Sequence, residues 1–172
     1  MHVGGGVVLG AWALLFTGPA AAEVVQSADT GFTVSHKLSI AAAPARVWEA
    51  LIHPGLWWEG AHTYSGDAKN LTLDARAGGC WCEKTASGGV EHMRVVYVAA
   101  PATLRLLGGL GPLQAMPVTG VMTIELKPVG AGTEANFTYA VAGPGGLAPV
   151  AAPVDGVLGS QWARLKAAAE KR

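Results

Sequence analysis

The chain has 172 residues, of which 51% are hydrophobic, and its 12 basic residues balance its 12 acidic residues. This composition excludes an intrinsically disordered chain, and the length suits one domain with a sizeable core better than two. Because Lys and Arg form no block or stripe, we expect neither nucleic acid nor a polybasic membrane surface as a partner.

Residues 1–22 carry the pattern of a secretory signal peptide. They contain no Asp, Glu, Lys or Arg, and the apolar stretch Val7–Phe16 is followed by Pro19 and Ala20-Ala21-Ala22. An apolar core, a helix breaker and an A-x-A site are together typical of a cleavable signal. We therefore expect an exported domain over residues 23–172, periplasmic or secreted and free of the membrane after cleavage. An uncleaved membrane anchor is the alternative, because the segment is about long enough to span a bilayer.

The next segment predicts a strand followed by two short helices. Apolar and polar residues alternate from Phe32 to Ile40, which indicates a half-buried strand. Pro44 suits the first turn of a helix, and a helical stripe of apolar residues runs from Val47 to Ile52. A second helical turn is expected at Leu56-Trp57-Trp58.

Six further strands and a long helix are expected in the remainder of the chain. Short turns connect most of the strands, so an antiparallel meander of about seven strands is predicted. The six strands are 71–73, 80–85, 90–98, 104–107, 118–126 and 137–141. From residue 153 onward, apolar residues recur at helical spacing. In this α+β arrangement the helix covers the concave face of a bent sheet, because no other element is long enough to do so.

Two layers closed in this way usually leave a cavity, where we expect a ligand to bind. The predicted lining is Met122, Phe137, Tyr139, Leu158 and Gln161. His36 interrupts an apolar strand face, so it is either a buried neutral histidine bonded to a backbone carbonyl or a polar group lining the cavity. Trp57 and Trp58, near His53 and His62, either pack the short helices onto the sheet or form an aromatic rim at the cavity mouth. The spacing of the two histidines supports no metal site.

Five features of the chain carry a resemblance to a known superfamily. They are Ile40–Leu51, Pro54–Trp58, Gly78-Gly79 opening a strand that contains Glu83, Pro101 before Leu104-Arg105-Leu106, and the helix Leu158–Leu165. Over residues 32–170 the chain resembles the START-like, or SRPBCC, superfamily, in particular its branch of polyketide cyclase and heat-shock-protein-activator-like domains. The resemblance implies a helix-grip fold, in which a curved antiparallel sheet wraps a long C-terminal helix.

Members are lipid carriers, hormone receptors, cyclases and chaperone activators, so the resemblance implies no particular catalytic residue. An export signal argues against the chaperone role, whose ATP-dependent partner is intracellular.

Cys80-Trp81-Cys82 is the most distinctive motif of the chain. In a strand both sulfur atoms point to one face, with the Cα atoms about 6.5–7 Å apart, at the limit for a disulfide. A disulfide therefore requires a bulge, which Gly79 permits. An oxidising compartment and an even number of cysteines favour the bond. The alternatives are two packed reduced thiols, or a metal or redox site with little support from the spacing.

Glu83 and His92 are the candidate acid–base pair. The register of the hairpin at 87–89 decides whether His92 lies beside Cys82 or opposite Glu83. A Glu83–His92 pair suits proton transfer, whereas a solvated cross-strand ion pair is the ordinary structural interpretation.

These observations favour an exported, non-enzymatic binding protein for a small apolar or amphipathic molecule, with no cofactor and no metal. One alternative is a cofactor-free cyclase or hydrolase in which Glu83, His92 or Tyr139 transfers protons. Another is a protein-binding domain with a filled interior. The sequence leaves the identity of the ligand and the oligomeric state open.

Overall fold

The computed structural model describes Met1 and residues 22–171. The predicted signal peptide lies, apart from its two ends, outside these described residues, so its cleavage stays a prediction. Among the described residues, no helix is both long and apolar enough to cross a membrane.

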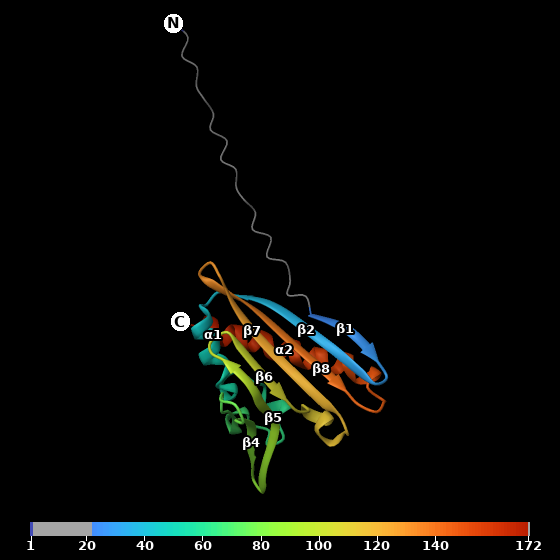
Figure 1. The fold of residues 1–172 in the computed structure, drawn as a ribbon. Coiled ribbons are helices and arrows are strands. Elements are labelled where there is room, and N and C mark those ends of the chain that lie inside the picture. The colour runs from blue at the N-terminus through green and yellow to red at the C-terminus, as the bar shows by residue number, and fades with distance from the viewer. Residues whose placement is uncertain (2–21, 172) are drawn as a thin grey trace.

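An antiparallel sheet of eight strands curves around a long helix (Figure 1). Hydrogen-bonded neighbours follow the order β1-β2-β8-β7-β6-β5-β4-β3, so the first strands of the chain pair with the last. The strands are β1 (Ala22–Ala28), β2 (Gly31–Ile40), β3 (Leu71–Leu73), β4 (Cys80–Thr85), β5 (Gly88–Ala99), β6 (Thr103–Leu107), β7 (Thr119–Val129) and β8 (Gly132–Ala142). All seven predicted strands form, and the predicted α+β helix-grip architecture is confirmed.

The eighth strand, β1, was not predicted from the sequence. It pairs with β2 at the edge of the sheet, and its residues from Val25 to Ala28 are exposed. A register shift between Val24 and Gln26 breaks the regular alternation further. Hydrophobic periodicity arises when one face of a strand is buried, so an exposed, irregular edge strand leaves no such signal.

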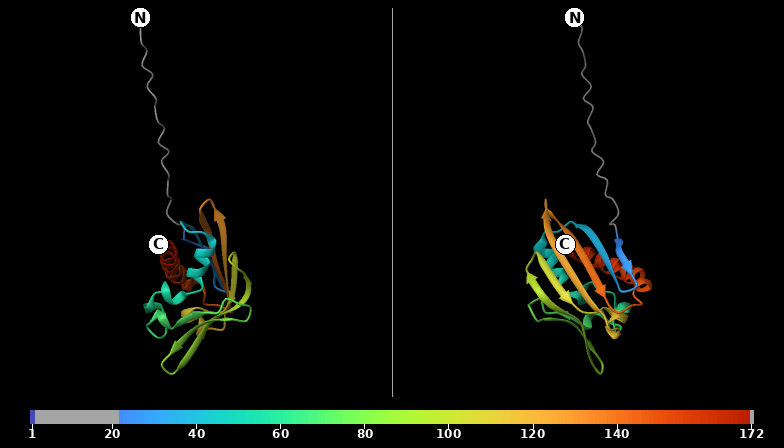
Figure 2. Two further views of the ribbon diagram at one scale, coloured as in Figure 1. Left: turned by 90° about the vertical axis from the view of Figure 1, so that its left-hand side faces the viewer. Right: turned by 45° about the vertical axis from the view of Figure 1, so that its right-hand side comes forward.

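The helices lie on the concave side of the sheet (Figure 2). They are α1 (Pro44–Leu51), α2 (Ala151–Glu170) and the short 3₁₀ helices η1 (Pro54–Leu56), η2 (Gly60–His62), η3 (Ala68–Asn70), η4 (Gly111–Ala115) and η5 (Ala148–Val150). The helix α2 begins two residues before Pro153, which occupies the first turn, where a missing N–H costs no helical hydrogen bond. Arg46 of α1 donates from Nε to the Ala169 carbonyl oxygen at 2.6 Å and so joins α1 to the end of α2.

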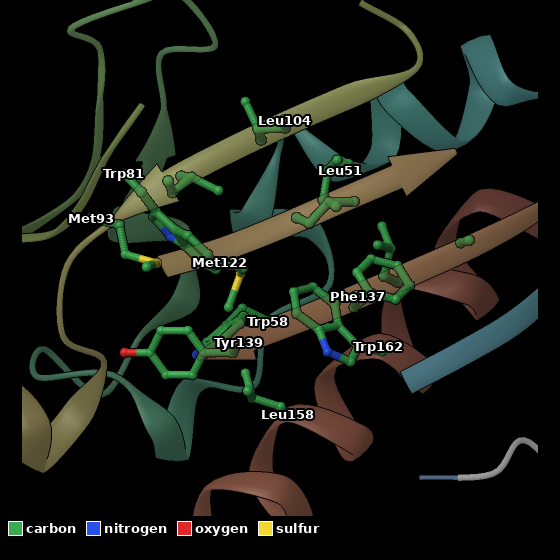
Figure 3. Packing of buried hydrophobic residues seen from close by; sticks show 14 of the residues in the cluster. Leu51, Trp58, Trp81, Met93, Leu104, Met122, Phe137, Tyr139, Leu158 and Trp162 are labelled. Carbon is green, nitrogen blue, oxygen red and sulfur yellow. The ribbon is translucent and has the colours of Figure 1, made fainter. Parts of the chain in front are cut away.

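Large side chains fill the middle of the space between α2 and the sheet (Figure 3). Trp162 of α2 stacks on Phe137 of β8, with ring centres 4.2 Å apart and an interplanar angle of 13°. Met122, Tyr139 and Gln161 are fully buried in the same interior. The predicted position of the cavity is therefore corrected: an inward-facing indole occupies the place where the sequence predicted open space.

Candidate functional site

A cavity of about 540 Å³ lies at one end of the space between α2 and the sheet. Its walls come from η5 and the first half of α2, from β3, β4 and β5, and from the segments 61–64 and 110–112, which include parts of η2 and η4. Most of the lining groups are apolar. A concave site of this size and character suits a small, largely apolar molecule.

Only part of the predicted lining lies at this cavity. Trp58 and Leu158 line it, as does the candidate base His92. The other residues predicted to contact a ligand are buried in the packed interior and do not line the cavity. They are His36, Trp57, Met122, Phe137, Tyr139 and Gln161. Trp57 illustrates the difference, because its Nε1–H donates to the Ala50 carbonyl at 2.9 Å and its ring packs against other core indoles. Of the two neighbouring tryptophans, Trp57 is therefore a packing residue and Trp58 a wall residue.

Two polar groups predicted to face the ligand have partners within the protein. His36 is buried, as one of its two expected environments required, but its Nε2 lies 2.9 Å from Asp155 Oδ1 on α2 rather than at a backbone carbonyl, and it lies outside the cavity lining. Burial lowers the pKa of His36, and the Asp155 carboxylate opposes that lowering. Gln161 accepts a hydrogen bond at Oε1 from the Glu59 backbone N–H at 2.9 Å. Both side chains therefore hold α2 to the rest of the fold.

Tyr139 does not have the environment of a proton-transfer group. Its hydroxyl donates to the Gly108 carbonyl at 3.0 Å and accepts from the Leu110 N–H at 3.2 Å. Burial raises the pKa of Tyr139 to about 12. The hydroxyl instead holds the loop that leads to residues 110–112 of the cavity wall.

The two histidines of the predicted rim lie in different places. His53 is not part of the lining, and its Nδ1 lies 2.7 Å from the Glu49 carbonyl oxygen. His62 lines the cavity, and its Nε2 lies 3.8 Å from Glu59 Oε2. The end of η2, which carries His62, therefore belongs to the cavity wall.

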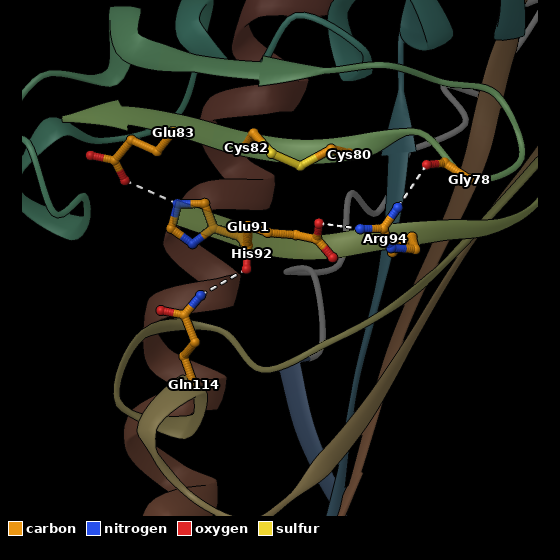
Figure 4. The surroundings of a disulfide bond; sticks show 8 residues. All are labelled: Gly78, Cys80, Cys82, Glu83, Glu91, His92, Arg94 and Gln114. Atoms are coloured by element: carbon orange, nitrogen blue, oxygen red, sulfur yellow. Dashed lines mark hydrogen bonds and ion pairs between the residues drawn. A yellow bond between two sulfur atoms is a disulfide. The ribbon is translucent and has the colours of Figure 1, made fainter. Parts of the chain in front are cut away.

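Cys80 and Cys82 form a disulfide on β4 (Figure 4). Their Cα atoms lie 5.3 Å apart, closer than in a regular strand, so β4 is locally contracted. The expected bulge is present, but in the partner strand. The register with β5 shifts between Trp81 and Cys82, which leaves His92 as the extra residue. The irregularity thus arises opposite the disulfide rather than at Gly79.

The bulge turns His92 into the interior, toward Glu83. Glu91 is exposed, whereas His92 and Met93 are both buried, which a regular strand would not allow for consecutive residues. His92 Nε2 lies 2.9 Å from Glu83 Oε2 (Figure 4). Glu83 is only 2% exposed and His92 only 7%, so the interpretation of a solvated ion pair is wrong.

Three N–H groups surround the Glu83 carboxylate. The backbone N–H of Tyr64 donates at 3.1 Å, and the backbone N–H of Ser65 and Nε2 of His92 complete the set. Burial raises the pKa of Glu83, but the hydrogen bonds from Ser65, Tyr64 and His92 lower it by more, so the pKa lies below its ordinary value of 4.5. Glu83 is therefore ionised at neutral pH and accepts hydrogen bonds only. It follows that His92 Nε2 carries a proton, so Nδ1 is the acceptor nitrogen of the ring whenever the imidazole is neutral.

Apart from the exposed ring of His62, two side-chain polar groups of the lining have no hydrogen-bond partner within residues 22–171. One is His92 Nδ1, and the other is the buried Nε1–H of Trp81, a residue that is only 3% exposed. The sequence analysis did not identify Trp81 as a wall residue. The alternation of side chains along the strand nevertheless indicates its position, because the two cysteine sulfur atoms point to one face and the residue between them points to the other. A buried N–H of this kind normally has a partner, which water or a ligand can supply.

Comparisons with known proteins agree with this fold. No curated protein sequence matches the chain. An uncharacterized protein from Rhizobium leguminosarum is similar in structure, with a TM-score of 0.62, 19% identity, and coverage of 86% of this chain and 100% of that one. CalU16 from Micromonospora echinospora gives a TM-score of 0.59 at 11% identity, over 90% and 88% of the two chains. A conserved protein of unknown function from Enterococcus faecalis gives 0.57 at 14% identity, over 89% and 78%.

The family assignment comes from the sequence itself. A family model described as polyketide cyclase / dehydrase and lipid transport matches residues 31–170. This range contains every element that forms the cavity, and it agrees with the START-like resemblance over 32–170. The chain therefore belongs to the polyketide cyclase / dehydrase and lipid transport family.

Proposed function

We propose that this protein binds a small apolar or amphipathic molecule in the cavity of about 540 Å³, and that it does so as an exported domain. The cavity, with its largely apolar wall, is the observation that carries the proposal. Family membership supports it, because lipid transport is part of the family description. The apolar segment before Ala20-Ala21-Ala22 and the Cys80–Cys82 disulfide support export to an oxidising compartment.

The size of the expected affinity follows from the apolar surface of the ligand that binding removes from water. Burying roughly 200 Å² of apolar surface contributes about 5 kcal/mol. Part of this free energy is offset by the lost freedom of the ligand. A bicyclic aromatic probe is therefore expected to bind with a Kd of about 0.2 mM to a few millimolar.

Titration with the neutral fluorescent probe N-phenyl-1-naphthylamine tests this proposal. We expect its emission to rise and to saturate at one probe per chain, because the cavity excludes water from the dye. Trp58 and Trp81 lie in the wall, so tryptophan emission should be quenched in parallel. If the emission does not rise in a saturable manner, the interior admits no ligand and the domain is better explained as a protein-binding module.

A second candidate function is cofactor-free proton transfer, favoured by the Glu83–His92 pair at the cavity wall. His92 Nδ1 would remove a proton from a carbon next to a carbonyl group. The electron pair of the broken C–H bond moves to the carbonyl oxygen, and the resulting enolate accepts a hydrogen bond from Trp81 Nε1–H. Return of a proton from His92 to the same carbon restores the starting protonation states, so no oxidant or cofactor is required.

Deuterium exchange into the methyl group of 2-acetylnaphthalene, followed by NMR in D₂O, tests this second function. If the pair is catalytic, exchange should exceed the buffer rate by about 100-fold or more. His92→Gln should abolish the excess, because the amide N–H₂ can still donate to Glu83 but no basic nitrogen remains. Exchange at the buffer rate eliminates the enzymatic candidate and leaves the binding proposal intact.

A further inference from the structure

We propose that the cavity prefers neutral apolar molecules carrying a hydroxyl group, whose hydrogen is donated to His92 Nδ1. This inference rests on the proposed binding function and names the chemical class of the ligand. It is carried by two buried side chains of the lining, each with a ring nitrogen that has no hydrogen-bond partner in the described chain: His92 with Nδ1 and Trp81 with Nε1–H.

The Glu83 carboxylate determines what His92 offers to a ligand. Glu83 lies behind the imidazole, buried, with its oxygens also accepting from two backbone N–H groups. An acceptor held in this way fixes the proton of His92 on Nε2, 2.9 Å from Glu83 Oε2. In the neutral ring Nδ1 is then a lone-pair acceptor on a residue of the cavity wall, and a hydroxyl group is a common neutral group that can donate to it.

Trp81 supplies the complementary donor. Its Nε1–H is buried without a partner in residues 22–171, and the centre of its ring lies 6.5 Å from the centre of the His92 ring. An oxygen atom near both rings can donate its hydrogen to one nitrogen and accept from the other. A hydroxyl group does both, whereas an ether or a ketone only accepts.

The charges around the cavity disfavour anionic ligands such as fatty-acid carboxylates. Within residues 22–171 no Lys or Arg belongs to the lining, the imidazole of His62 lies 3.8 Å from the Glu59 carboxylate, and the buried carboxylate of Glu83 behind His92 is negative. A carboxylate in this wall would lose its hydration without gaining a Lys or Arg partner. The neutral hydroxyl group avoids this cost.

A matched set of naphthalene derivatives tests the inference: 2-naphthol, 2-methylnaphthalene and 2-naphthoate. Affinities are measured by displacement of N-phenyl-1-naphthylamine at pH 7. In the parent protein we expect 2-naphthol to bind at least as tightly as 2-methylnaphthalene, although the methyl derivative is the more hydrophobic of the two. We expect 2-naphthoate to bind most weakly. Trp81→Phe should lower the naphthol-to-methylnaphthalene affinity ratio about tenfold, the loss of one hydrogen bond, and His92→Phe should lower it by a similar factor.

Trp58→Phe is the matched control. Trp58 also lines the cavity, but its Nε1–H already donates to the His62 carbonyl at 2.9 Å, so its loss should change both affinities by the same factor. Trp81→Phe leaves the Glu83–His92 pair in place, so it tests the inference even if His92→Phe fails to fold. An unchanged ratio in Trp81→Phe and in every folded His92 variant, or 2-naphthoate binding as tightly as 2-naphthol, overturns the inference. If neither neutral derivative binds the parent protein, the proposed function itself fails.

Discussion

Replacing Glu83 with alanine is expected to lower the free energy of unfolding by about 3–5 kcal/mol. The substitution leaves the N–H groups of Tyr64 and Ser65 and Nε2 of His92 without their acceptor. The cost is large because Glu83 is only 2% exposed, so water does not readily replace the carboxylate. Urea denaturation followed by tryptophan fluorescence measures the change.

Two comparison variants isolate the buried contacts of Glu83. Glu83→Gln retains an acceptor oxygen and the size of the side chain, so a smaller loss of about 1–3 kcal/mol is expected. Glu91→Ala removes an exposed carboxylate of the neighbouring strand, whose partner is Arg94, and should change stability by no more than about 1 kcal/mol. An effect of Glu83→Ala as small as that of Glu91→Ala would contradict the buried arrangement.

The same carboxylate makes the stability depend on pH. The pKa of Glu83 in the folded protein lies below 4.5, so the native state favours the ionised form more than the unfolded chain does. Its contribution is therefore fully present above the unfolded pKa and is lost as the pH falls through the folded pKa. Wild-type stability should decrease in this acidic window, and the decrease should be smaller in Glu83→Gln, which cannot titrate.

Replacing Val157 with tryptophan is expected to weaken binding of N-phenyl-1-naphthylamine at least tenfold while the domain stays folded. Val157 lies in the first half of α2, lines the cavity and is only partly buried. A larger side chain at this position extends into empty space rather than into the packed core, so it competes with the probe at little cost in stability. Probe titration and thermal melting, done on the same preparation, measure both effects.

Ala163→Trp is the control for this substitution. Ala163 is an exposed residue of the same helix, outside the cavity lining, so an added indole there should leave probe binding unchanged. In a tightly packed core, by contrast, overpacking costs about 1–3 kcal/mol. A marked loss of stability in Val157→Trp together with unchanged probe binding would show that the probe binds elsewhere and that the cavity is not the site.

A wall of aromatic rings separates the cavity from the packed interior. Trp57 packs against three other tryptophans. Its ring centre lies 5.4 Å from that of Trp58, 6.4 Å from that of Trp81 and 5.7 Å from that of Trp162. Trp58 and Trp81 face the cavity on one side of this group, while Trp162 stacks on Phe137 on the other. The cluster would therefore confine a ligand of the proposed kind to one end of the helix-grip fold and limit the length of the molecule that can enter.

The fold was predictable because its signals are local. The alternation from Phe32 to Ile40, the stripe from Val47 to Ile52 and the helical spacing after residue 153 each record which side of one element is buried. Neighbouring residues decide such patterns, so strand and helix positions follow from the sequence without knowledge of distant contacts. The edge strand β1 is the exception, because its exposed residues have no buried face to record.

The site depended on tertiary structure, because distant contacts decide it. The sequence analysis identified Glu83, His92, Trp58 and Leu158 as candidate site residues. The contact between Glu83 and His92, however, requires a bulge in β5. The register that produces this bulge cannot be read from either strand alone. The cavity lies where it does because Trp162 fills the centre of the interior, and which inward-facing side chains meet depends on how helix and sheet pack. Periodicity tells which residues turn inward, whereas only three-dimensional packing decides whether the space they face is filled or open.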